Sequence, residues 1–204
     1  NLTVRFFQER QDETCSFRNS SSALAFTTST VPLGEYCFEM EDVFGGNTTQ
    51  GFANTSWASG QLPGEVGIYW AVENADLYSP KVNYTSVLYH LRPVLSADTN
   101  EHTDRSVSVY PAKGCETWDP TSKLPINPPV PWYGFSCWGE EEGNCGTSEY
   151  GARSFRILPA QKESDLAGKC IVFAECGAAM SLYTSSRTIV GAALSASMVI
   201  WSTL

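Results

Sequence analysis

The chain has 204 residues, 42% of them hydrophobic, which is enough for one large domain or two small ones. Its formal net charge is −9, from 13 basic and 22 acidic residues. Because nucleic-acid binding needs a basic face, this balance argues against nucleic acid as a partner. The acidic excess fits a soluble, solvated exterior.

Short runs rich in Val, Ile, Tyr and Phe predict β-strands along most of the chain. In order, the runs are 4–9, 67–72, 85–91, 106–110, 154–158 and 170–174. Residues 106–110 alternate polar and apolar, as a half-buried strand does. Gly and Pro separate the runs, and the proline-rich stretch 124–131 predicts an extended loop. The pattern predicts an all-β protein built of sandwiches or barrels.

The chain ends in an uncharged, largely apolar run of 16 residues, 189–204. Small residues at 177–179 and a polar stretch at 183–187 precede it. This order is the pattern of a GPI-attachment signal, so we expect a lipid on Gly177 or on a nearby small residue such as Ser185. A buried segment of the fold and a short membrane anchor are the alternatives, although a spanning helix needs about 20 residues.

N-glycosylation sequons are the strongest motif signal. Five asparagines stand in N-x-[ST] with x not Pro: Asn1, Asn19, Asn47, Asn54 and Asn83. All five precede residue 86, so the second half carries none. Glycans are bulky and hydrophilic, so these sites are expected to face water, and the second half is the better candidate for a bare contact surface.

Seven cysteines indicate an oxidising compartment, with one thiol left over or paired to another chain. They are Cys15, Cys37, Cys115, Cys137, Cys145, Cys170 and Cys176. None forms a C-x-x-C pair, which removes support for zinc-ribbon and thioredoxin sites. The separation of 22 positions occurs twice, and on it we predict disulfides Cys15–Cys37 and Cys115–Cys137. Cys145 would then pair with Cys170 or Cys176.

The repeated cysteine spacing belongs to a wider internal similarity. Residues 4–7 precede Cys15 as 107–110 precede Cys115, and 31–42 resemble 130–142. We therefore predict a tandem of two β domains. The predicted boundaries are 1–95 for the glycosylated first domain, 96–105 for a linker, 106–176 for the second domain and 177–204 for the GPI signal.

Residues 154–158, followed by Gly168-Lys-Cys-Ile-Val-Phe173, resemble the second half of a βγ-crystallin-type Greek-key motif. The tandem of units of similar length agrees with that family's two-domain layout. The resemblance implies two Greek-key-like β-sandwich domains. The family's calcium-binding pattern is nowhere intact, so the resemblance implies no metal. The chain also looks like the small secreted or GPI-linked glycoproteins of filamentous fungi.

Catalytic signatures are weak. His90 falls in a predicted strand and His102 in the predicted linker, and for both a structural or solvated role is favoured over catalysis. No G-x-S-x-G motif occurs. The acidic run 140–142 could supply oxygen ligands for calcium, but a solvated loop is favoured. We expect no cofactor and no metal.

Aromatic side chains in Gly/Pro-rich loops are candidates for stacking on sugars. The expected binding residues are Trp132, Tyr133 and Trp138, and core packing is the alternative role for these rings.

The sequence thus predicts a non-enzymatic glycoprotein of the cell surface or cell wall, held by a lipid anchor, that binds a cell-wall glycan or a surface protein or has a structural role. A secreted toxin or effector of crystallin-like type and a glycoside-active enzyme remain alternatives.

Overall fold

The computed structural model describes residues 1–8, 16–20, 22–54, 67–92, 101–116, 132–159 and 169–176. Almost all regular structure in these ranges is β-strand, so the all-β prediction is confirmed. The strands and short helices are β1 (Leu2–Phe7), β2 (Leu24–Thr28), β3 (Tyr36–Glu39), α1 (Met40–Phe44), β4 (Gln50–Asn54), β5 (Gly67–Glu73), η1 (Ala75–Leu77), β6 (Ser86–Leu91), β7 (His102–Tyr110), η2 (Lys113–Cys115), β8 (Trp132–Cys137), β9 (Asn144–Thr147), β10 (Ser154–Pro159) and β11 (Ala174–Cys176).

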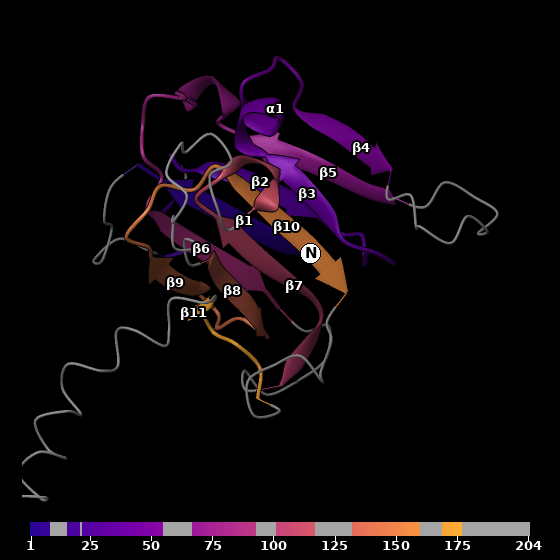
Figure 1. Ribbon diagram of the computed structural model, residues 1–204. Coiled ribbons are helices and arrows are strands. Elements are labelled where there is room, and N and C mark those ends of the chain that lie inside the picture. The colour runs from indigo at the N-terminus through magenta and orange to yellow at the C-terminus, as the bar shows by residue number, and fades with distance from the viewer. Residues whose placement is uncertain are drawn as a thin grey trace, which may run out of the picture.

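The strands form two antiparallel sheets that stack face to face (Figure 1). Sheet A has the order β4-β5-β2-β1-β6-β9, and sheet B has the order β11-β8-β7-β10-β3. Alternation along each strand sends one set of side chains into the space between the sheets. In β1, for example, Leu2, Val4 and Phe6 are buried in the shared core.

Aromatic rings occupy the centre of the core. Phe155 of β10 lies 5.3 Å from Phe6, 4.9 Å from Phe26 and 5.2 Å from Phe38, measured between ring centroids. These rings come from both sheets, so the sandwich has one continuous core. Helix α1 closes one end by burying Met40, Val43 and Phe44 with the i, i+3, i+4 spacing of a helical face.

The prediction of two tandem domains, 1–95 and 106–176, is wrong. Strand β3 from the first half pairs with β10 from the second, and β6 from the first half pairs with β9 from the second. Both sheets therefore mix the two halves, and neither half has a core of its own. The matched segments 4–7 and 107–110 lie in different sheets of one sandwich. In the predicted linker 96–105, residues from His102 onward already belong to β7.

The predicted disulfide pairing is also wrong, although the prediction that these cysteines form disulfides holds for Cys37, Cys115, Cys137, Cys145 and Cys170. The bonds are Cys37–Cys115 and Cys137–Cys170. Equal spacing in the sequence does not determine the pairing, because η2 packs against β3. The Gly114 N–H donates to Glu39 Oε1, and this contact lies beside the Cys37–Cys115 bond. Cys145 is disulfide-bonded too, but not to Cys170. The side chains of Cys15 and Cys176 lie outside the described part of the chain.

Five of the six predicted strand runs overlap β1, β5, β6, β7 and β10, with ends that differ by at most four residues. The sixth, 170–174, is misplaced, since β11 begins at Ala174. Strands β2, β3, β4, β8 and β9 were not predicted. They are four to six residues long, and several carry Gly or polar residues, so they lack the apolar run on which the prediction relies.

Candidate functional site

All five sequon asparagines are exposed, as N-glycosylation requires. Each belongs to a segment that adjoins sheet A. Asn1 precedes β1, Asn19 lies between β1 and β2, Asn47 between α1 and β4, Asn54 ends β4, and Asn83 precedes β6. The bare surface predicted for the second half of the sequence is thus better described as the outer face of sheet B.

An aromatic–cationic stack crosses three neighbouring strands on the outer side of sheet B. The ring centroids of Trp132 in β8 and Tyr110 in β7 are 5.8 Å apart with an interplanar angle of 27°. The Arg156 guanidinium of β10 lies 5.4 Å from the Tyr110 centroid and donates to Glu35 at 2.9 Å. We take Trp132, Arg156 and Glu35, which surround the buried ring of Tyr110 (6% exposed), as the candidate binding face, since aromatic faces beside charged groups can hold polar ligands.

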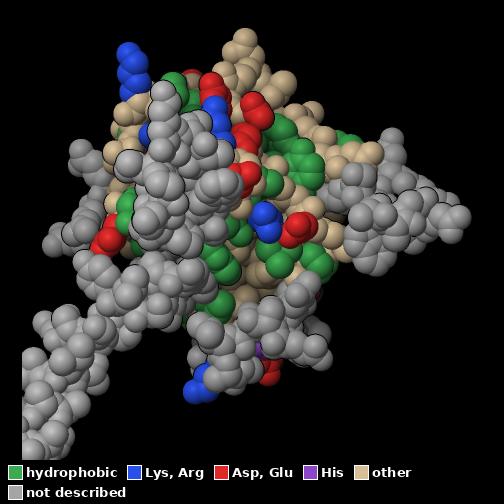
Figure 2. All heavy atoms as spheres, viewed as in Figure 1, with side chains coloured by type: hydrophobic (Ala, Val, Ile, Leu, Met, Phe, Trp, Pro, Cys, Tyr) green, Lys and Arg blue, Asp and Glu red, His purple; other side chains and the backbone are tan. Residues whose placement is uncertain are grey.

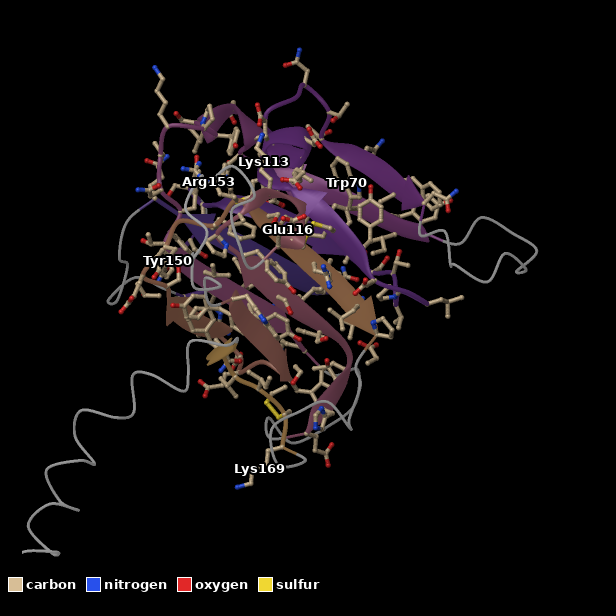
Figure 3. All side chains as sticks on the ribbon, in the orientation of Figure 1. Trp70, Lys113, Glu116, Tyr150, Arg153 and Lys169 are labelled. Carbon is tan, nitrogen blue, oxygen red and sulfur yellow. A yellow bond between two sulfur atoms is a disulfide. The ribbon has the colours of Figure 1, made fainter. Side chains whose placement is uncertain are left out.

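A group of carboxylates extends this face toward η2. Lys113 and Glu41 form an ion pair at 2.6 Å, and their hydrogen bond lowers the pKa of Glu41 and raises that of Lys113. Glu116 follows η2, and its Oε2, like Oε2 of Glu39, is buried without a hydrogen-bond partner among the described residues. Figure 3 shows Lys113 and Glu116 on the side of the sandwich that faces the viewer. Figure 2 shows acidic and basic side chains next to one another on that side.

The three predicted binding aromatics have different positions. Trp132 belongs to the candidate face. Tyr133 is only 6% exposed and stacks on Phe173 at 4.9 Å, and Trp138 packs partly buried against the core. Adjacent strand residues point to opposite faces, so Trp132 and Tyr133 cannot share one platform. Tyr110 and Arg156 were not predicted, although the alternation of 106–110 offered a signal that Tyr110 faces away from Val107 and Val109.

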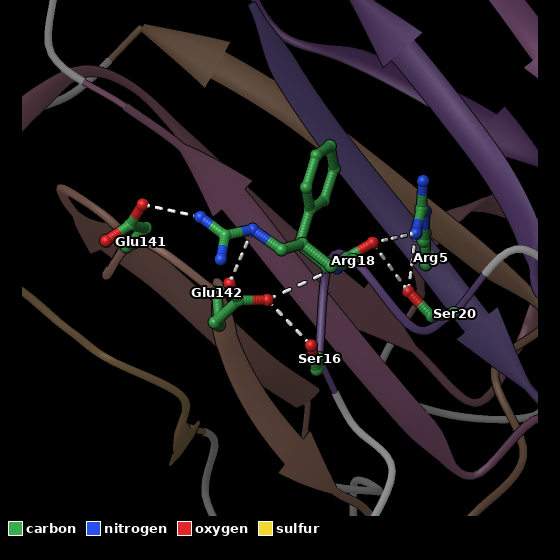
Figure 4. Close-up of polar contacts among 7 residues, drawn as sticks. Arg5, Ser16, Arg18, Ser20, Glu141 and Glu142 are labelled. Carbon is green, nitrogen blue, oxygen red and sulfur yellow. Dashed lines mark hydrogen bonds and ion pairs between the residues drawn. The ribbon is translucent and has the colours of Figure 1, made fainter.

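A second polar cluster holds residues 16–20 against the outer side of sheet A (Figure 4). The Ser16 hydroxyl donates to Glu142 Oε2 at 2.7 Å, and Arg18 forms ion pairs with Glu141 and Glu142. Arg5 donates to the Phe17 carbonyl at 2.6 Å. The acidic run 140–142 is thus a partner of residues 16–18. The ion pairs are exposed, so each contributes little to stability.

His90 lies beneath this cluster and has a structural environment. Its ring stacks on Phe17 with centroids 3.9 Å apart. Burial is the main reason that the pKa of His90 is lowered from its usual value of 6.5. The hydrogen bond from Ser16 is the main reason that the pKa of Glu142 is lowered. Because the pKa of His90 is lowered, the folded protein favours its neutral imidazole.

Stability should fall on acidification, in two stages. The pKa of His90 is lower in the folded state than in the unfolded state. Its contribution to the free energy of unfolding is therefore complete at pH values above 6.5, and it is lost as the pH falls from there through the folded-state pKa. The Glu142 carboxylate stabilises the fold at pH values above its usual pKa of 4.5. This stabilisation is lost as the pH falls below that value toward the lowered folded-state pKa. Urea unfolding at about pH 7.5 and about pH 5.5 should show a decrease for the wild type and a smaller one for His90→Gln. An equal decrease in both proteins would contradict this role of His90.

A cavity of about 370 Å³ lies at one end of the sandwich, where β1 ends and β2 begins. Its lining residues are Phe6, Phe7, Gln8, Ser22, Ala23, Leu24, Leu77 and Tyr84. The volume is at the low end for ligand sites, and Phe6, Phe7 and Leu24 are at most 3% exposed. Leu77, which is 44% exposed, is the one large apolar side chain of this lining with much accessible surface, so the outer face of sheet B is the better candidate.

The described ranges hold no candidate metal site and no helix of membrane-spanning length. No three His, Cys, Asp or Glu side chains in those ranges are grouped as a metal site. The helices within the described part of the chain are too short to cross a lipid bilayer. Gly177, Ser185 and the whole tail 177–204 lie outside the described residues.

Comparison with known proteins supplies no relative. No family model, no curated protein and no solved structure matches the chain. The βγ-crystallin-type resemblance accordingly stays a prediction that depends on the quoted motifs alone.

Proposed function

We propose that the protein is a secreted N-glycosylated β-sandwich, displayed on a cell surface or in a cell wall through a GPI anchor. We propose a non-enzymatic role, structural or in binding a glycan or another surface protein. The supporting observation is the distribution of sequons: all five are exposed and adjoin sheet A, whereas sheet B is free of them. Disulfides agree with an oxidising compartment.

The outer face of sheet B is the proposed contact surface. The partly exposed Trp132, which stacks on the buried Tyr110, offers apolar ring surface, and Arg156 with Glu35 offers hydrogen-bond donors and acceptors beside it. The ring surface suits the apolar face of a sugar, and the charged groups suit its hydroxyls. The same charged groups could instead bind polar side chains of a surface protein. A bulky glycan on sheet A would leave this face accessible.

Two measurements on the full precursor, expressed in a eukaryotic host, test the proposed secretion, glycosylation and membrane anchoring. Glycopeptide mass spectrometry should find glycans on the sequons, and phosphatidylinositol-specific phospholipase should release the protein from cells. A protein that carries no glycan at any of the five sites would contradict secretion. Failure of the phospholipase to release surface-bound protein would remove the lipid anchor from the proposal.

Binding is tested on a glycan array and on intact cells, with Trp132→Ala against Tyr150→Ala as the control. Tyr150 is an exposed aromatic outside the stack. Loss of a central aromatic contact typically weakens binding by about tenfold or more, so Trp132→Ala should lose about that factor and Tyr150→Ala should not. Equal binding by both variants would exclude this face. Turnover of a bound glycan would instead favour a glycoside-active enzyme. Damage to foreign cells would favour a secreted toxin.

A further inference from the structure

Two exposed aromatic rings lie together on the outer side of sheet A, at its β4 edge. Phe52 of β4 is 37% exposed and Tyr69 of β5 is 58% exposed. They are direct cross-strand partners, and their ring centroids are 4.6 Å apart. Most large apolar side chains of this sandwich are buried, so these two exposed rings side by side form an apolar patch on this face.

A glycosylation sequon adjoins this pair. Asn54, exposed at the end of β4, is two residues from Phe52 and therefore projects from the same face of the strand. Its cross-strand partner is Gly67, which has no side chain to intervene. The Phe52 ring occupies that place: a Cβ on Gly67 would lie 2.4 Å from Phe52 Cζ. The ring thus reaches the strand position directly opposite Asn54.

We propose that the N-glycan on Asn54 folds back onto Phe52 and Tyr69, with its first N-acetylglucosamine against the rings. A pyranose has an apolar face of C–H groups and a polar rim. Stacking the apolar face on aromatic rings removes their surface from water, while the hydroxyls stay solvated. The sugar is covalently attached on the same strand face, so little freedom is lost when it docks. This inference depends on the N-glycosylation in the proposed function.

The position also explains why the glycan would be useful. β4 is the terminal strand in the order of sheet A, so it is an edge that other chains could extend. A bulky hydrophilic glycan at Asn54, lying across Phe52 and Tyr69, covers the apolar pair and obstructs pairing at this edge. A second protein strand on β4 is the competing occupant.

The test is a double-mutant cycle on the full-length glycoprotein made in a eukaryotic host. Site occupancy at Asn54 and at Asn47 is first measured by glycopeptide mass spectrometry. Thermal unfolding is then recorded for the wild type, Asn54→Gln, Phe52→Ala and the double variant, with Asn47→Gln as the matched control. The cycle separates sugar stacking from any effect of Phe52 on the fold itself.

Asn54→Gln should lower Tm by about 2–4 °C and Asn47→Gln by less than about 1 °C. Phe52→Ala should lower Tm in the glycosylated protein and have little effect when Asn54 is already Gln. Endoglycosidase trimming to one N-acetylglucosamine should preserve the effect, because the first sugar makes the contact. Additive effects of the two substitutions at an occupied Asn54 would overturn the stacking and leave the proposed function intact.

An unoccupied Asn54 beside other occupied sequons would also overturn the stacking without affecting the proposed function. Absence of glycan at all five sites would overturn both. Self-association of the fully glycosylated wild type that Phe52→Ala abolishes would identify a second chain as the occupant, against the proposal.

Discussion

Replacing Cys37 and Cys115 together by alanine is expected to lower the free energy of unfolding by about 4.5 kcal/mol and Tm by about 9–18 °C. The bond closes a loop with a sequence separation of 78, so its loss frees a large part of the unfolded chain. It also joins β3 to η2, across the two halves of the sequence. Urea or thermal unfolding of purified protein measures the change.

The matched control is Cys137→Ala with Cys170→Ala. That bond has a sequence separation of 33, and the same chain-entropy relation gives about 3.7 kcal/mol. Both proteins should unfold in one cooperative transition, because both sheets draw strands from both halves. Two separate transitions, or a non-reducing peptide map with a Cys15–Cys37 link, would contradict the observed topology.

Phe155→Ala is expected to cost about 3–5 kcal/mol. Phe155 is fully buried and contacts aromatic rings of both sheets, so truncation leaves a cavity that the rigid strands cannot close. Denaturant unfolding of the variant measures the loss.

The control is Phe52→Ala in the unglycosylated protein, where the same chemical change at an exposed position should cost within about 0.5 kcal/mol. A small effect at Phe155 would mean that the two sheets do not share this core.

Local pattern predicted what depends on neighbouring residues. The alternation in 106–110 was correctly interpreted as a strand, and the apolar runs of β1, β5, β6 and β10 were located as well. These strands are central or flank the core and so carry dense apolar signal. Shorter strands such as β4 and β9 carry little of it, because they lie at an edge of sheet A and bury few side chains.

The candidate binding face could be predicted only in part. Trp132 was selected as an aromatic in a Gly/Pro-rich region, and it does lie on the outer face of sheet B. Its neighbours Tyr110 and Arg156 are 22 and 24 residues away in sequence and meet it through strand pairing. Tyr133 was selected by the same compositional rule as Trp132, yet the pleat directs it inward.

The sequence by itself determined the all-β class, the five sequons and the presence of disulfides, because each depends on residue type or on a short motif. Only the tertiary structure decided that there is one sandwich instead of two domains, which cysteines pair, and which face stays free of sequons. Those features depend on contacts between residues far apart in the chain, such as β3 with β10 and Cys37 with Cys115. Equal spacing of cysteines indicates a repeat only when the strands around them pair locally, and here they do not.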